Sequence, residues 1–216
     1  MNVKLIAITK PLILELSIDE FIAYVARVSN PSNQNNNLTA PKLLKYLISH
    51  EHFSPFEMAS LTMEIQTTRD IGRQILRHRS FSFQEFSQRY AEVVGDFELR
   101  EARLQDPKNR QNSIPTENEE LKKVWENYQR VVSSISKGVY DWALKNGIAK
   151  EQARAVLPEG LTPTRMYMAG TLRSWIHYCA LRSANGTQEE HKEIAKAAFK
   201  IVLEQFPSLK ELFQNQ

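Results

Sequence analysis

Residues 59 to 66 read Ala-Ser-Leu-Thr-Met-Glu-Ile-Gln, and they establish the fold class. Apolar side chains occupy every second position of this stretch, and polar side chains lie between them. A period of two indicates a β-strand with one buried face and one face in water. Such half-exposed strands are typical of antiparallel sheets, because parallel sheets are covered on both faces. We therefore expect an α+β fold in which a small, mainly antiparallel sheet packs with several helices.

Further elements are expected on both sides of this strand. Val3 to Thr9 is typical of a short strand, because it is rich in branched residues. Ser17-Ile-Asp-Glu20 is a capping box, and apolar residues follow it at helical spacing. Two more helices are expected before the middle of the chain, one with Pro41 in its first turn and one from Thr68 to near Arg77. A long helix is expected from a Thr116–Glu119 capping box to Asn146-Gly147. Three others are expected from about Ala149 to Leu157, from about Thr164 to Leu181, and after a Thr187–Glu190 cap. Leu104 to Ile114 is expected to be a polar surface loop.

The composition is that of a globular protein and favours no special class of partner. The chain has 216 residues, 42% hydrophobic and 25% charged, and a net charge of only +3. We find no repeat and no linker, so residues 1–216 are expected to form one domain. No segment approaches the ~20 apolar residues of a membrane span, and the first residues do not resemble a signal peptide. The single cysteine, Cys179, excludes an internal disulfide and fits a reducing compartment, so the expected location is the cytoplasm.

Residues 74 to 90 read Gln-Ile-Leu-Arg-His-Arg-Ser-Phe-Ser-Phe-Gln-Glu-Phe-Ser-Gln-Arg-Tyr. Three bases stand together at Arg77, His78 and Arg79, and aromatic residues alternate with the polar ones that follow. Arginine holds phosphate with a planar fork and stacks on rings, and aromatic side chains supply flat apolar walls. The segment indicates a pocket for a flat, anionic ligand such as a nucleotide. The alternative is a basic rim formed by a helix end and a strand.

Spacing within this segment suggests which side chains act together. Gln74 and Arg77 are three residues apart, so on a helix they would share one face. Glu85, Ser87 and Arg89 alternate, so in an extended segment they would face one side. An acceptor, a hydroxyl and a cation on one face would suit a sugar-phosphate. The alternative for Glu85 is an ion pair with a neighbouring arginine.

Residues 171 to 182 form another polar block within the expected last-but-one helix. Arg173, His177 and Arg182 are expected to form a polar stripe on an otherwise apolar helix. A buried arginine is costly without a partner, so a ligand or an acid must meet this stripe. Cys179 lies among apolar neighbours without an adjacent base, so we interpret it as a structural residue.

A metal site is not expected. His50, His52 and His78 lack surrounding acids, and the chain has no cysteine cluster to complete a set of ligands.

The spacing Arg-His-Arg, seven residues, Ser, one residue, Arg resembles the signature of the flavin-dependent thymidylate synthases (ThyX). Arg77, His78, Arg79, Ser87 and Arg89 supply all of its positions, and Ser82 falls at the family's inner serine. Three other segments are similar to further blocks of the family: His52 to Glu57, Ala153 to Pro158, and Thr171 to Arg182.

This resemblance implies a function. Members reductively methylate dUMP to dTMP, with methylenetetrahydrofolate as the one-carbon donor and NADPH as the reductant through FAD, producing tetrahydrofolate. It also implies a homotetramer with shared active sites, and neither a nucleic-acid nor a membrane partner. No Gly-x-Gly-x-x-Gly stretch is present, so FAD is not expected in a Rossmann crevice.

The resemblance assigns ligand contacts residue by residue. Contacts to dUMP fall on Gln74, Ile75, Leu76, Arg77, Glu85, Phe86, Ser87, Gln88, Arg89, Arg154 and Arg182. Contacts to FAD fall on His52, Ser54, Arg77, His78, Arg79, Glu85, Thr171, Leu172, Arg173 and His177. We expect Arg182 to be the catalytic residue, because a guanidinium at the N3/O2 edge of uracil would favour the enolate-like form of the ring.

Two other functions are compatible with residues 77 to 90. Arginines interleaved with aromatic side chains also suit stacking of single-stranded nucleic acid by a module without catalysis. A serine hydrolase that uses Ser87 and His78 is less favoured, because the sequence has no nucleophile elbow. Bound flavin would separate the first interpretation from both.

Overall fold

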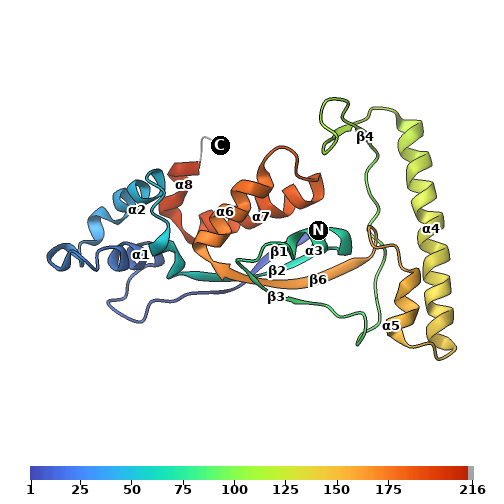
Figure 1. Ribbon diagram of the computed structural model, residues 1–216, viewed down its shortest axis with the longest axis horizontal. Coiled ribbons are helices and arrows are strands. Elements are labelled where there is room, and N and C mark those ends of the chain that lie inside the picture. Colours follow the sequence, from blue (N-terminus) through green and yellow to red (C-terminus); the bar gives the residue numbers. More distant parts are fainter. Residues whose placement is uncertain (214–216) are drawn as a thin grey trace.

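A four-stranded antiparallel sheet forms the centre of the computed structural model, which describes residues 1–213 (Figure 1). The strand order is β1, β2, β6, β3. Their bounds are Asn2–Ile8, Ser60–Thr68, Pro163–Thr171 and Ser82–Glu85. Each neighbouring pair is antiparallel. The expected α+β class with a small antiparallel sheet is confirmed.

The alternation in β2 has the predicted consequence. Leu61, Met63 and Ile65 are at most 1% exposed, and Glu64 between them lies on the other face. Met63 stands opposite Met168 of β6 in the register, so the apolar faces of the two strands coincide. The hydrophobic core therefore lies on one face of the sheet.

Strand β6 corrects the helix that we expected from about Thr164 to Leu181. Residues 163 to 171 are extended and lie in the sheet between β2 and β3, and helix α6 begins only at Leu172 and ends at Ser183. Thr164, Met166 and Met168 are buried, whereas Arg165 is exposed and Tyr167 is only partly buried. That is a period of two, and the sheet position overrides the moderate helix preference of these residues.

Helices cover the apolar face and one end of the sheet (Figure 1). α6 and α7 lie together over the sheet, and α1, α2 and α8 gather at the end where α6 begins. The bounds are Ile18–Ala26 for α1, Ala40–Ser49 for α2, Arg69–Ile75 for α3, Glu189–Gln205 for α7 and Pro207–Phe213 for α8. The capping box at Ser17 and Glu20 is formed as predicted, and Pro41 lies in the first turn of α2. Trp175 of α6 is fully buried in the core.

The other end of the molecule contains α4 (Glu119–Lys145), α5 (Lys150–Ala153), and a hairpin of β4 (Arg103–Gln105) and β5 (Ser113–Pro115) (Figure 1). The hairpin corrects the expected loop over Leu104 to Ile114. The helix that we expected to reach Leu157 is α5 followed by a 3-10 turn at Arg154–Val156.

Two predicted capping boxes are wrong. Asn118, not Thr116, caps α4, because the Asn118 side chain accepts a hydrogen bond from the Leu121 backbone N–H. Helix α7 begins after Gln188, and the Glu190 side chain bonds to Arg100 and Arg103 instead of capping the helix.

Helix α4 leaves a long apolar face in water. Nine large apolar side chains on it are between 39% and 66% exposed: Leu121, Val124, Trp125, Tyr128, Val131, Val132, Ile135, Val139 and Trp142. A continuous apolar face of this length marks an interaction surface. Within residues 1–213 no helix is both long enough and apolar enough to cross a membrane.

Candidate active site

The signature segment connects α3 to β3. Helix α3 ends at Ile75, and tight turns follow, in which the His78 N–H donates to the Ile75 carbonyl and the Phe81 N–H donates to the His78 carbonyl. The Phe81 ring is anchored edge-on against Trp175, with ring centroids 4.9 Å apart. The bases of the signature therefore stand on a short loop that the core holds at one end.

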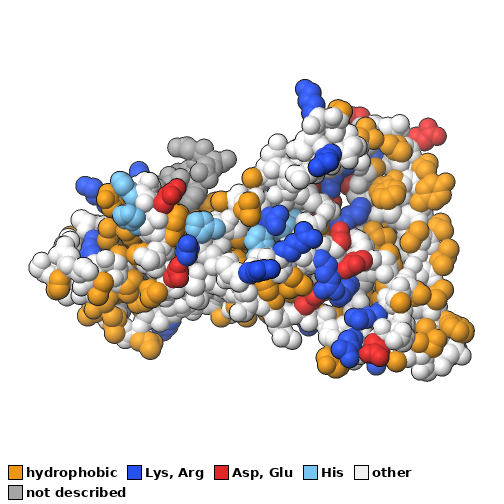
Figure 2. Space-filling model, viewed as in Figure 1, with side chains coloured by type: hydrophobic (Ala, Val, Ile, Leu, Met, Phe, Trp, Pro, Cys, Tyr) orange, Lys and Arg blue, Asp and Glu red, His pale blue; other side chains and the backbone are white. Residues whose placement is uncertain are grey.

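The helix end corrects one expectation. Arg77 lies beyond α3, so Gln74 and Arg77 do not share a helix face. Arg77 and Arg79 are exposed, whereas His78 is half-buried. On the face of the molecule that Figure 2 shows, Lys and Arg side chains are concentrated near the middle, with acidic side chains among them.

His78 meets Arg182 from the last turn of α6. The Arg182 Nε–H donates to His78 Nε2 at 2.8 Å, and the His78 ring lies edge-on to Tyr178 at 4.8 Å. Burial, together with the neighbouring Arg182 charge, lowers the pKa of His78 to about 4. At neutral pH His78 is therefore an uncharged acceptor, and its proton is on Nδ1.

Gln74 extends this group on the other side. Its Nε2 donates to Gln188 Oε1 at 2.7 Å, and its Oε1 lies 3.3 Å from His191 Nδ1. His191 Nε2 in turn lies 3.1 Å from the Tyr178 hydroxyl. We call Gln74, His78, Tyr178, Arg182 and His191 the Arg182 group.

A second set lies at the start of α6. A hollow of about 310 Å³ is bordered by His52, Ser54, Glu57 and Arg173. Arg173 pairs with Glu57, and His177 packs edge-on against Phe53 with centroids 4.5 Å apart. Burial and the Arg173 charge lower the pKa of His177. Four predicted FAD contacts thus come together, and we call them the Arg173 group: His52, Ser54, Arg173 and His177.

The polar stripe expected along α6 does not exist. Arg173 pairs with Glu57, whereas Arg182 reaches His78. Nine residues at about 100° per residue place them half a turn apart, on opposite sides of the helix. Arg173 and His177 are also exposed rather than buried.

A third set lies next to α5. The chain turns between Ser87 and Tyr90, so Glu85, Ser87 and Arg89 do not face one side of an extended segment as expected. Arg89 pairs with Glu151 at 3.4 Å, and Arg154 Nε donates to the Glu151 carbonyl at 3.3 Å. These predicted dUMP contacts form the Arg89 group: Ser87, Arg89 and Arg154.

Glu85 belongs to none of these groups. It pairs with Arg69 at 3.5 Å and Arg73 at 3.3 Å, and it accepts a hydrogen bond from Thr164 at 2.9 Å. The ion pair with nearby arginines, which was the alternative interpretation of Glu85, is therefore formed. Its contact with both ligands stays a prediction.

Several other predicted contacts have restricted side chains. Ile75 and Leu172 are fully buried in the core, so any contact they make with a ligand runs through the main chain. The Thr171 hydroxyl accepts from the Ser174 N–H and caps α6. Leu76 and Phe86 are partly buried against apolar clusters, and Gln88 is 4% exposed.

Cys179 is 1% exposed, and burial raises the pKa of its thiol well above the ordinary value. This burial is compatible with the structural role that the sequence predicted for Cys179. A thiol in this environment stays protonated, so it is a poor nucleophile. Among the described side chains, those of residues 1–210, no group of three His, Cys, Asp or Glu is arranged to hold a metal ion.

The sequence interpretation missed His191, Tyr178, Gln188 and Glu190. Gln188 and His191 are three residues apart at the start of α7, and that spacing was the available signal. Gln188 also lines a hollow of about 730 Å³ bordered by Arg103 and Trp125, where no ligand contact was predicted.

In outline, the chain is an α+β protein whose cations, neutral histidines and hydroxyls suit a flat anionic ligand. Comparison with known proteins is more specific. The family model described as thymidylate synthase complementing protein matches residues 12–208. The chain therefore belongs to this family of flavin-dependent thymidylate synthases.

Individual relatives match over nearly the whole chain. The chain is 52% identical over 210 residues to a probable flavin-dependent thymidylate synthase of Paramecium bursaria Chlorella virus 1, covering 97% of both chains. It is 51% identical over 213 residues to the flavin-dependent thymidylate synthase of a Synechocystis species, again covering 97% of both. The fold is similar to that of a UMP/dUMP methylase from Streptomyces cacaoi bound with 5-Br dUMP, with a TM-score of 0.84, 26% identity, and coverage of 99% and 94%.

Proposed function

We propose that this protein carries out the reaction of its family through the Arg182 and Arg89 groups, which bind dUMP, and the Arg173 group, which binds FAD. The enzyme is an FAD-dependent thymidylate synthase that methylates dUMP to dTMP. Methylenetetrahydrofolate is the proposed one-carbon donor, and NADPH is the proposed reductant. Tetrahydrofolate leaves as the second product.

The observation that carries the proposal is the state of Arg182. Its polar partner among the side chains of residues 1–210 is the neutral His78, and no carboxylate of these residues pairs with it. A half-buried guanidinium that is not neutralised attracts negative charge strongly, because little water screens it. This is the property needed to stabilise charge that develops on a pyrimidine ring.

In this proposal Arg182 activates the uracil ring. C5 of uracil must become nucleophilic before it accepts a one-carbon unit. A guanidinium at the N3/O2 edge stabilises the enolate-like ring in which C5 carries the excess electron density. His78 orients Arg182 by accepting its Nε–H, which leaves the terminal N–H groups for the ligand. Cys179 cannot replace this activation by attacking the ring, because it is buried and protonated.

The Arg173 group fits FAD in its chemistry. Arg173 offers a charge for a diphosphate, Ser54 offers a hydroxyl, and His52 offers a ring surface at the same hollow. The His177 ring packs against Phe53, which also borders this hollow. Bound there, the reduced cofactor would supply the hydride that completes the methyl group. The residues of this chain bind and orient the reactants.

The three groups stand apart within one chain, which supports an active site shared between subunits. Arg154 directly follows α5, which lies at one end of the molecule, whereas Arg173 is in the first turn of α6, which begins beside the group of α1, α2 and α8 on the other side (Figure 1). Exposed hydrophobic side chains line α4 along its length (Figure 2). They give each chain a surface that a second copy of the chain could cover. We propose a homotetramer in which the Arg89 group of one chain completes the Arg182 group of another.

Absorption spectroscopy tests the cofactor, and a product assay tests the reaction. The purified protein should show a flavin spectrum that changes when dUMP is added. With methylenetetrahydrofolate and NADPH it should convert dUMP to dTMP. A colourless protein that takes up no FAD on incubation would contradict the proposal.

Mixing two inactive variants tests the shared site. Arg89→Ala and Arg182→Ala should each be inactive alone. If they are unfolded and refolded together, a mixed pair has one site with both changes and one site with neither, so some activity should return. Proven mixed oligomers without recovered activity would show that both arginines serve one site from one chain.

A further inference from the structure

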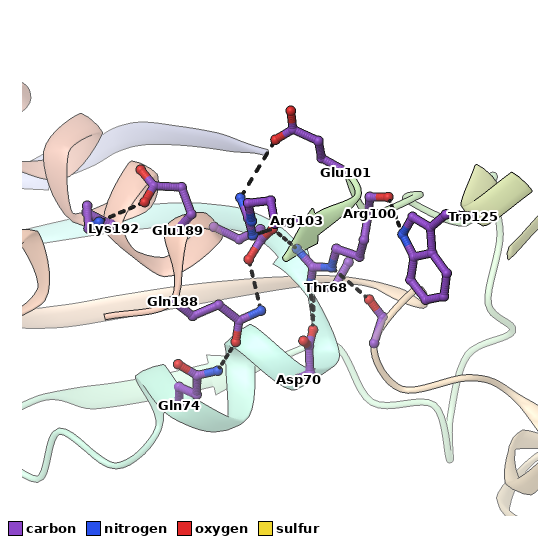
Figure 3. Close-up of polar contacts among 12 residues, drawn as sticks. Thr68, Asp70, Gln74, Arg100, Glu101, Arg103, Trp125, Gln188, Glu189 and Lys192 are labelled. Atoms are coloured by element: carbon purple, nitrogen blue, oxygen red, sulfur yellow. Dashed lines mark hydrogen bonds and ion pairs between the residues drawn. The ribbon is translucent and has the colours of Figure 1, made fainter. Parts of the chain in front are cut away.

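A chain of hydrogen bonds runs from Gln74 to a buried carboxylate on α7 (Figure 3). Gln74 donates to Gln188 Oε1 at 2.7 Å, and Gln188 Nε2 donates to Glu190 Oε2 at 2.9 Å. Glu190 is 5% exposed and forms ion pairs with both Arg100 and Arg103. A carboxylate held by two arginines thus ends a chain that begins at a proposed dUMP contact.

The two arginines keep Glu190 ionised. Burial alone would raise the pKa of the Glu190 carboxyl, but its own backbone N–H, Gln188, Arg100 and Arg103 together lower it below the ordinary value. Arg100 is itself fixed, because it also pairs with Asp70 at 2.8 Å and donates to the Gly160 carbonyl at 3.2 Å (Figure 3). An ionised carboxylate accepts hydrogen bonds and donates none.

Because the ionised Glu190 carboxylate can only accept, the direction of every hydrogen bond along the chain is fixed. Gln188 must present its NH₂ to Glu190, so its oxygen faces Gln74. Gln74 must then present its NH₂ to that oxygen, so its own oxygen faces His191 Nδ1 at 3.3 Å. An amide oxygen only accepts, and His191 must therefore carry its proton on Nδ1.

The last link closes on Tyr178. With the proton on Nδ1, His191 Nε2 is an acceptor, and the Tyr178 hydroxyl donates to it across 3.1 Å. His191 is fully buried, and burial together with the charge on Arg182 lowers its pKa to about 3, so the ring stays neutral. The Tyr178 ring also supports His78, the partner of Arg182.

Reversing the Gln74 amide would be unfavourable at both ends. Its NH₂ would meet the His191 N–H, and its oxygen would meet the Gln188 oxygen. In the observed orientation one N–H of Gln74 is used by Gln188, and the second N–H remains for a ligand acceptor such as a carbonyl or phosphate oxygen. The orientation of the Gln74 amide therefore decides whether Gln74 presents a hydrogen-bond donor or an acceptor to a substrate.

We infer that Glu190, Gln188 and His191 are positioning residues that fix the direction of the Gln74 amide for dUMP. The inference rests on the proposed function, because it takes Gln74 as a dUMP contact. It adds residues that neither the signature nor the predicted site contains.

The first experiment measures the affinity of the FAD-bound protein for dUMP by calorimetry. His191→Leu removes the donor to Gln74 and should weaken dUMP binding about tenfold, the size of one well-made hydrogen bond. His191→Asn keeps an N–H near the position of Nδ1 and should restore affinity to within about threefold of the original. Glu190→Gln lets the chain reverse and should also weaken binding about tenfold.

A double-mutant cycle separates positioning from a general structural role. In a Gln74→Ala background, His191→Leu and Glu190→Gln should cause no further loss of dUMP affinity, because both act through Gln74. Additional losses in that background, or no loss from Gln74→Ala itself, would overturn the inference. FAD affinity should stay unchanged in all variants, which shows that the fold is intact.

The proton on His191 gives a readout independent of activity. Solid-state NMR of protein labelled with ¹⁵N-histidine distinguishes the two neutral tautomers, and His191→Asn assigns the signal among the 5 histidines. A proton on Nδ1 is expected, and a proton on Nε2 would overturn the inference whatever the protein binds. A wild-type protein that has this tautomer but does not bind dUMP would instead contradict the proposed function.

Discussion

Helix α6 carries one arginine at each end, and the two stand in opposite electrostatic environments. Arg173 in the first turn pairs with Glu57, and both side chains are nearly half exposed, at 49% and 41%. Arg182 in the last turn is half-buried and faces the neutral ring of His78. Arg173 is neutralised in water, whereas Arg182 has no oppositely charged partner among the described side chains and is less exposed to water.

This difference separates binding from polarisation. A solvent-exposed ion pair has little net energy, so Glu57 can release Arg173 to a phosphate group at small cost. Arg182 pairs with no carboxylate among the side chains that the structure describes, and its neutral partner leaves its positive charge available to whatever ligand is present. We therefore expect Arg173 to determine how tightly the cofactor is held and Arg182 to determine how fast the reaction runs.

Replacing Arg182 should have the largest effect. Arg182→Ala removes a preorganised donor aimed at developing charge, which is worth about 2.7–4 kcal/mol, so turnover should fall by roughly a hundredfold or more. FAD should remain bound, because Arg182 is assigned to the pyrimidine. Steady-state kinetics and the flavin spectrum check both statements.

A matched arginine on the surface provides the control. Arg130 on α4 pairs with Glu126 in water, and Arg130→Ala should leave turnover nearly unchanged. Near-normal turnover in Arg182→Ala would remove Arg182 from the mechanism and erase the contrast between the two helix ends.

Replacing Arg173 should act on the cofactor instead. Arg173→Ala loses a charge-assisted hydrogen bond worth about 1.5–3 kcal/mol, so the dissociation constant of FAD should rise by about ten- to a hundredfold. Saturating FAD should restore most of the turnover. Titration of the protein freed of flavin measures the affinity.

Glu57→Gln sharpens this test, because it frees Arg173 without deleting it. FAD affinity should be equal to or greater than that of the original protein. A loss of affinity as large as that of Arg173→Ala would mean that the ion pair itself, and not the free guanidinium, builds the cofactor site.

The sequence predicted the parts of this contrast that depend on local pattern. Alternation identified β2, the signature selected Arg77 and His78, and the family block from Thr171 to Arg182 selected Arg182. It failed at β6, where the same alternation of Met166 and Met168 was present but was read as helix. The strand forms there because β2 and β3 offer hydrogen-bonding edges on both sides, and that information lies far away in the chain.

The environment of each site residue was less predictable than its identity. Whether Arg182 meets an acid or a neutral ring depends on the packing of α6 against the loop after α3. The direction of the Gln74 amide depends on Glu190, which is 116 residues away from Gln74 in sequence and is held by arginines from a third segment. Such networks arise from tertiary contacts, so spacing along the chain gives only partial signals.

Acid should destabilise the protein through the histidines of the Arg182 group. The folded pKa values are about 4 for His78 and about 3 for His191, whereas an unfolded histidine titrates near ~6.5. Between those values the unfolded chain binds protons that the folded chain does not, so the free energy of unfolding falls as the pH falls below about 6.5. The slope is at most about 1.4 kcal/mol per pH unit for each histidine.

His191→Asn isolates one contribution, because asparagine does not titrate. Its free energy of unfolding should fall less between pH 7 and about 5 than that of the original protein. Denaturant unfolding at the two pH values measures this difference. Parallel behaviour of the two proteins would show that His191 is protonated in the folded state at pH 5 and that the Arg182 end of α6 is not as dry as its burial indicates.

The smallest effect is expected at Cys179, which lies on α6 between the two arginines. Its side chain is 1% exposed, and burial raises the pKa of the thiol. A buried, protonated thiol is a poor nucleophile, so we expect Cys179 to take no part in the reaction. Cys179→Ala removes one buried sulfur atom and should lower stability by about 1 kcal/mol. Turnover should stay within about threefold. If a folded, FAD-bound Cys179→Ala lost all activity, the ring would need a thiolate, and the unneutralised charge on Arg182 would not be sufficient to activate it.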